Sequence, residues 1–101
     1  MKVVYSTYAV EQLEIILHFL VNEQGVPFEK AFQIRQKIID KADLLTDKPR
    51  LGQLDENFDR LLLQHRRLIV GNYKIIYLIE DDVVYISDIF DTRQDPKKMN
   101  G

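Results

Sequence analysis

The charged side chains that could do chemistry are sorted by sign along the second half of the chain. Between residues 60 and 74 every charged side chain is basic, and between residues 80 and 95 all but one are acidic. Such sorting can mark a site, but two strands with differently charged solvated faces would show the same pattern. The basic stretch holds Arg60, Arg66, Arg67 and Lys74 with His65, and the acidic stretch holds Glu80, Asp81, Asp82, Asp88, Asp91 and Asp95 with the single base Arg93.

Several kinds of site are excluded by the residue types that the chain lacks. It has no cysteine, which excludes disulfides, thiolate zinc sites, iron–sulfur clusters and a cysteine nucleophile. Its two histidines, His18 and His65, cannot make a metal site alone, and the acids of the second half are not spaced as a calcium loop. We therefore expect no metal and no cofactor. His65 fits either a general base or a partly packed strand histidine.

The whole chain has the size and charge balance of one ordinary domain, which we expect to span residues 1–101. It carries 14 basic and 16 acidic residues, a net charge of −2 and a pI near 5.6. This balance argues against a generic binder of polyanions, because such proteins usually show a strong basic excess. The sequence has neither a run of about 20 apolar residues for a membrane helix nor a signal-peptide core. A cytoplasmic protein without membrane contact is expected.

The first half of the chain has the pattern of a short strand followed by two helices. Residues 2–5 are β-branched and aromatic, and Ser6 or Thr7 can cap the next helix. Gly25 and Pro27 separate that helix from a second one, which gives an antiparallel hairpin. The expected inner stripes are Ala9, Leu13, Ile16, Leu17, Leu20 and Val21 in the first helix, and Phe28, Ala31, Phe32, Arg35, Ile38, Ile39, Ala42 and Leu45 in the second.

The second half changes to the alternating period of strands. Residues 49–57 are predicted to form a loop, and residues 58–70, 73–80 and 83–91 three strands joined by tight turns. The element order is therefore β-α-α-β-β-β. We expect a two-layer α+β domain in which the N-terminal strand and helix hairpin pack on an antiparallel meander sheet.

One face of this sheet is left without helices. Alternation along the middle strand places Lys74, Ile76 and Leu78 on it, which predicts a docking surface for a protein partner unless loops or the C-terminal tail cover it. Arg66 and Arg67 must point to opposite faces for the same reason. Asp88 shares its phase with apolar neighbours, and a β-bulge that shifts the register explains this better than a buried carboxylate.

Taken in order, these motifs resemble the RelE/ParE superfamily of bacterial type II toxins over about residues 3–98. The first strand and Ser6-Thr7-Tyr8-Ala9 are similar to the start of the family, and Pro49 and Gly52 to its Pro-x-x-Gly loop. Residues 66–77, Arg-Arg-Leu-Ile-Val-Gly-Asn-Tyr-Lys-Ile-Ile-Tyr, resemble its core, and Arg93-Gln94-Asp95-Pro96 its exit. The resemblance also implies that the N-terminal strand joins the sheet beside the last strand.

The resemblance implies two possible mechanisms. RelE-like members are ribosome-dependent mRNA endonucleases, and in such a metal-independent nuclease the catalytic cations would fall on Arg67, Lys74 and Arg93. ParE-like members are not nucleases and inhibit DNA gyrase by binding it. Both kinds are neutralised by a cognate antitoxin. Arg93 has a structural alternative, in which it pairs with Asp91, Asp95 or the Asp81-Asp82 turn and fixes the exit of the chain from the sheet.

Departures from the nuclease pattern favour the ParE-like mechanism. Lys74 stands where the nucleases usually carry arginine. A lysine cannot make the bidentate contact with a phosphate that an arginine makes. Met99 stands near the position of the family's C-terminal tyrosine or histidine, and methionine cannot carry a proton. An acidic chain is also poorly suited to ribosome binding, which depends on phosphate contacts. We therefore expect a growth-inhibiting binding protein rather than an enzyme, with the RelE-like endonuclease as the alternative.

Overall fold

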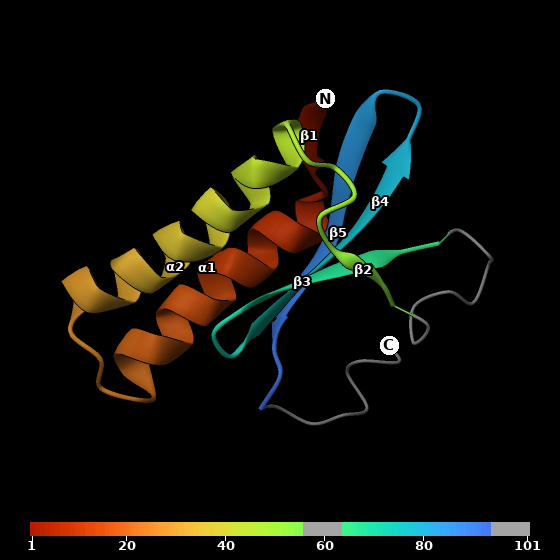
Figure 1. The fold of residues 1–101 in the computed structure, drawn as a ribbon. Helices are drawn as coiled ribbons and strands as arrows, with labels where there is room; N and C mark the ends of the chain where they lie inside the picture. The colour runs from red at the N-terminus through yellow and green to blue at the C-terminus, as the bar shows by residue number, and fades with distance from the viewer. Residues whose placement is uncertain (56–63, 94–101) are drawn as a thin grey trace.

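A mixed sheet of five strands is covered on one face by two antiparallel helices (Figure 1). The computed structural model describes residues 1–55 and 64–93. Within them the elements are β1 (Lys2–Tyr5), α1 (Thr7–Asn22), α2 (Phe28–Asp43), the 3-10 helix η1 (Leu44–Thr46), β2 (Gln53–Leu54), β3 (Arg66–Val70), β4 (Tyr73–Glu80) and β5 (Val83–Asp91). In this part of the chain, no helix is long and apolar enough to cross a membrane.

The strand order β1-β5-β4-β3-β2 confirms the predicted meander and the place of the N-terminal strand. β1 pairs with β5 in parallel, and the other neighbours are antiparallel. Two strand predictions need correction. The loop predicted for 49–57 contains β2, and β3 begins at Arg66 because Gln64 has a positive φ of 56° that does not fit a strand. Residues 58–63 of that predicted strand lie outside the described residues.

Helix α1 begins and packs as its sequence predicts. The Ser6 hydroxyl accepts a hydrogen bond from the Ala9 N–H at 3.0 Å, which satisfies one of the free donors of the first turn. The chain leaves the helix hairpin through Gly25, whose φ of +66° is a conformation that glycine adopts at little cost. The stripe faces the sheet, with Ala9, Leu13, Ile16 and Leu20 buried and Leu17 and Val21 packed against them.

The inner stripe of α2 is narrower than the sequence suggests. Ala31, Ile38 and Ala42 are buried as expected, whereas Phe28 is 60% exposed and Phe32 45%. Residues that follow one another on a helix point about 100° apart, so Phe32 turns away from the sheet when Ala31 faces it. The exposed rings instead contact each other, with centroids 6.1 Å apart, on the solvent side of the helix layer.

A buried tyrosine joins the sheet to the segment that leads into β2. The Tyr77 hydroxyl donates a hydrogen bond to the Pro49 carbonyl and accepts one from the Gly52 N–H, both at 2.8 Å. Only glycine fits this approach, because a Cβ at position 52 would come within 2.4 Å of the Arg67 carbonyl oxygen. This contact fixes the path of the chain into β2 and explains the spacing of Pro49 and Gly52.

Replacing Tyr77 with phenylalanine tests that contact. We expect Tyr77→Phe to lower the free energy of unfolding by about 1–3 kcal/mol, because the Gly52 N–H and the Pro49 carbonyl lose a buried partner. Urea unfolding measures the change. Tyr85→Phe is the matched control, since Tyr85 is exposed and should stay within about 0.5 kcal/mol of the parent. Equal effects of the two substitutions would contradict this role for Tyr77.

Candidate functional site

The sheet separates the residues that the sequence singles out onto two faces. Tyr73, Ile75 and Tyr77 of β4 belong to the core under the helices. Lys74, Ile76 and Leu78 alternate with them and therefore point to the other face, together with Arg67 of β3, which is the cross-strand neighbour of Ile76.

On that other face, two of the predicted cations meet one carboxylate. Lys74 Nζ lies 2.8 Å from Asp55 Oδ2, and Arg67 Nη1 lies 3.9 Å from the same oxygen. Asp55 is only 1% exposed, and Lys74 is also buried. Lys74 Nζ lies 5.8 Å from the centre of the Phe90 ring, within the range of a cation–π contact. The positive charge of Lys74 is thus neutralised inside the protein.

Arg67 is held by β2, the strand that directly precedes Asp55. Its guanidinium donates hydrogen bonds to the Leu54 carbonyl at 2.9 Å and to Gln53 Oε1 at 3.0 Å. Arg66 points to the opposite face, as expected, where its Nη1 donates to the Gly52 carbonyl at 2.7 Å. His65 is half-buried, and its backbone carbonyl accepts from the Asp55 N–H at 2.8 Å. The two arginines and His65 therefore hold β2 and Asp55 in place.

The prediction that Ile76 lies exposed for docking is wrong, because Ile76 is fully buried. It occupies the central strand, and its cross-strand neighbours Arg67 and Asp88 flank it on both sides. Lys74 is buried with Asp55, and Leu78 is half-buried. Of the three predicted docking residues, Leu78 keeps the most contact with solvent.

The bulge predicted for the last strand is present. The β4–β5 register shifts so that Tyr77 pairs with Ile86 and Ile76 with Asp88, which leaves Ser87 as the extra residue. Asp88 thereby turns to the face away from the helices. Burial nevertheless raises the pKa of its carboxyl, and a hydrogen bond from the Ile89 N–H lowers it in part.

Arg93 lies on the opposite side of the sheet from Lys74. Its Nε and Nη2 donate to the two carboxylate oxygens of Asp91 at 3.1 and 2.8 Å, a bidentate fork. Asp91 pairs with Tyr73, whose side chain faces the helices. Burial raises the pKa of the Asp91 carboxyl, but the Arg93 fork outweighs it and holds that pKa below its usual value. The structure thus does not bring Arg67, Lys74 and Arg93 together.

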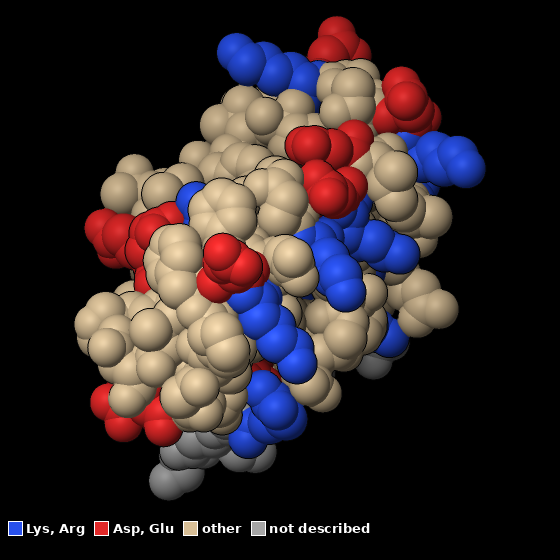
Figure 2. Space-filling view, turned by 90° about the vertical axis from the view of Figure 1, so that its left-hand side faces the viewer, with Lys and Arg blue, Asp and Glu red and all other residues tan. Residues whose placement is uncertain are grey.

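A basic groove opens between the helix layer and the β3–β4 turn, with a volume of about 470 Å³. Figure 2 shows Lys and Arg side chains forming a band across this side of the molecule. Lys30, Ile34 and Lys37 are spaced one helical turn apart on α2, a signal from which the groove could have been predicted. The groove is lined by Leu20, Gln24, Val26, Lys30, Ile34, Lys37, Val70, Gly71, Asn72, Tyr73 and Arg93.

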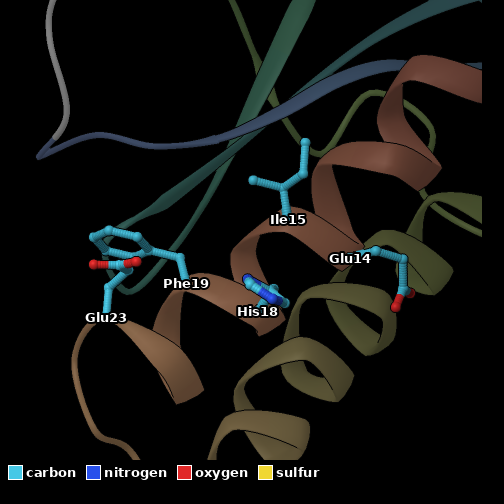
Figure 3. A pocket seen from close by; sticks show the side chains of 5 residues that line it. All are labelled: Glu14, Ile15, His18, Phe19 and Glu23. Carbon is cyan, nitrogen blue, oxygen red and sulfur yellow. The ribbon is translucent and has the colours of Figure 1, made fainter.

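A second hollow, of about 430 Å³, lies on the outer side of α1 and is lined by Glu14, Ile15, His18, Phe19 and Glu23 (Figure 3). Its acidic residues are Glu14 and Glu23, whereas the charged residues of the basic groove are Lys30, Lys37 and Arg93. Among residues 1–55 and 64–93, no group of three or more His, Cys, Asp or Glu side chains could hold a metal ion.

Comparisons with known proteins agree with the fold. The family "ParE toxin of type II toxin-antitoxin system, parDE" matches residues 3–96. The chain is also similar to a solved structure from P. aeruginosa, described as a chromosomal ParDE TA system, with a TM-score of 0.73 and 18% identity. That similarity covers 92% of this chain and 97% of the other and shows the fold. No curated protein matches the chain.

The ion pair between Lys74 and Asp55 can be tested by a double-mutant cycle. We expect Lys74→Met and Asp55→Asn each to lower the free energy of unfolding by about 3–5 kcal/mol, because each substitution breaks the buried ion pair. The double variant should lose less than the sum of the two. Glu14→Gln is the control, since the exposed Glu14–Arg35 pair is worth about 0–1 kcal/mol. Additive effects in urea unfolding would contradict the pairing.

Proposed function

This chain belongs to the ParE toxin family of type II toxin–antitoxin systems, and on that premise we propose that it inhibits growth by binding a protein target such as DNA gyrase. A cognate antitoxin neutralises it by binding directly. We place the protein, its target and its antitoxin in the cytoplasm.

The separation of the three cations is the observation that carries this proposal. A nuclease that acts without a metal needs fixed cations that converge on the phosphate, where negative charge develops in the transition state. Arg67 and Lys74 instead share the Asp55 carboxylate, and Arg93 is forked to Asp91 on the other face. This supports a binding protein over the RelE-like alternative, a ribosome-dependent mRNA endonuclease that would use these three residues.

The basic groove is where we place the antitoxin. Lys74 and Ile76 are buried, which leaves little of the predicted docking surface beyond Leu78. The groove instead combines apolar walls, such as Val26 and Ile34, with the cations Lys30 and Lys37. An acidic antitoxin with an amphipathic segment complements both properties, and such segments commonly become ordered when they bind.

Two activity assays test the proposed mechanism. The purified protein is expected to inhibit supercoiling by gyrase and to leave mRNA on ribosomes uncut. In the double variant Arg67→Ala with Arg93→Ala, growth inhibition should persist and change only through stability or binding, because neither side chain is required for phosphate chemistry. Arg50→Ala, a change at an exposed arginine outside the groove, is the control. Codon-dependent mRNA cleavage by the parent that is lost in a folded double variant would establish the nuclease instead.

Charge reversal tests the place of the antitoxin. Lys30→Glu with Lys37→Glu should weaken the antitoxin complex by about tenfold or more, because two favourable contacts become repulsive. Isothermal titration at low and high salt measures the loss, which should shrink as salt screens the charges. Lys2→Glu with Lys48→Glu makes the same change at exposed positions outside the groove. If both pairs weaken binding equally, the antitoxin docks elsewhere.

A further inference from the structure

The hollow on α1 presents apolar side chains that the fold does not use. Ile15 and Phe19 lie one helical turn apart, and Ile15 is 55% exposed. Figure 3 shows both side chains on the side of α1 away from α2, whereas Glu14 points toward α2. Exposed apolar groups in a hollow of this size favour a partner's apolar side chain, because burying them removes their surface from water.

The charge at this hollow is negative. Glu23 is the C-cap residue of α1, and the last turn of that helix has no basic residue. The carbonyl end of a helix carries partial negative charge, which favours a cation there and disfavours a glutamate. Among the described residues, Glu23 has no cationic partner within ion-pair distance, whereas Glu14 accepts hydrogen bonds from Arg35 at 2.7 and 3.0 Å. The unneutralised charge thus lies at the Glu23 end of the hollow.

Opposite charge separates this hollow from the basic groove. The groove presents Lys30 and Lys37, which attract an acidic segment, and the Glu23 end of the hollow repels one. A segment that carries Lys or Arg beside apolar residues is instead attracted by the Glu23 end of the hollow and repelled by the groove. The two surfaces therefore discriminate between partners of opposite charge.

We propose that the α1 hollow is a docking site for a basic amphipathic segment of a second protein, distinct from the acidic partner of the groove. An apolar side chain of that segment packs against Ile15 and Phe19, and a Lys or Arg side chain meets Glu23 and the carbonyl end of α1. The segment lies along one exposed helix face, as in other complexes that bury a few apolar anchors within a charged rim.

A synthetic amphipathic helical peptide of Leu and Lys is the probe for this site. Titrated into the full-length protein, it should shift the NMR amide signals of Ile15, His18, Phe19 and Glu23. Glu23→Lys and Ile15→Ser should each weaken binding by about tenfold or more. The same peptide with Glu in place of Lys should not shift these signals.

Matched controls lie on the same helix outside the hollow. Glu11→Lys is the control for Glu23→Lys, and Val10→Ser is the control for Ile15→Ser. Both controls change exposed positions and should leave the affinity for the peptide unchanged. The proposal is overturned if the Lys peptide does not bind, if its shifts lie elsewhere, or if the control variants lose as much affinity. Peptide binding requires neither toxicity nor an antitoxin, so the result stands independently of the proposed function.

Discussion

The buried hydroxyl of Tyr77 is the contact on which the arrangement of the sheet's outer face depends. It holds the carbonyl of Pro49 and the N–H of Gly52, and burial raises the pKa of its phenol, which keeps it protonated as a donor. With this segment fixed, β2 pairs with β3 and carries Asp55 to Lys74. A change at Tyr77 or Gly52 thus reaches the buried ion pair through the backbone.

Charged side chains in and beside the sheet are paired with one another, which limits their availability for binding a ligand or a partner. A buried ammonium or carboxylate is tolerated only with a partner, so Lys74 and Asp55 each account for the presence of the other. At the end of β5 the buried carboxylate of Asp91 is likewise neutralised by Arg93, whose own side chain reaches solvent. Charges paired in this way stabilise the fold and are not available to bind a partner. The surfaces with unused binding capacity lie instead on and beside the helices, in the basic groove and the α1 hollow.

Features determined by neighbours in sequence could be predicted, and those determined by distant residues could not. The Ser6 cap, the buried stripe of α1 and the bulge before Asp88 each follow from local spacing. Asp55 escaped notice because its role depends on β2, a strand of only two residues whose place is set by contacts to Tyr77. Of the basic groove, the spacing of Lys30, Ile34 and Lys37 indicates only the wall that α2 supplies, since α2 and the β3–β4 turn meet only in the folded chain.

The geometry of α1 relates the two proposed docking sites to each other. Leu20 lines the basic groove and Phe19 lines the α1 hollow, so successive residues of one helical turn face the two sites. Side chains that follow one another on a helix point about 100° apart, which keeps the sites distinct although they share a turn. A partner in the groove can therefore contact this turn without covering Phe19. Because the packed core transmits displacements of a helix, a shift of α1 on binding at one site would also move the walls of the other.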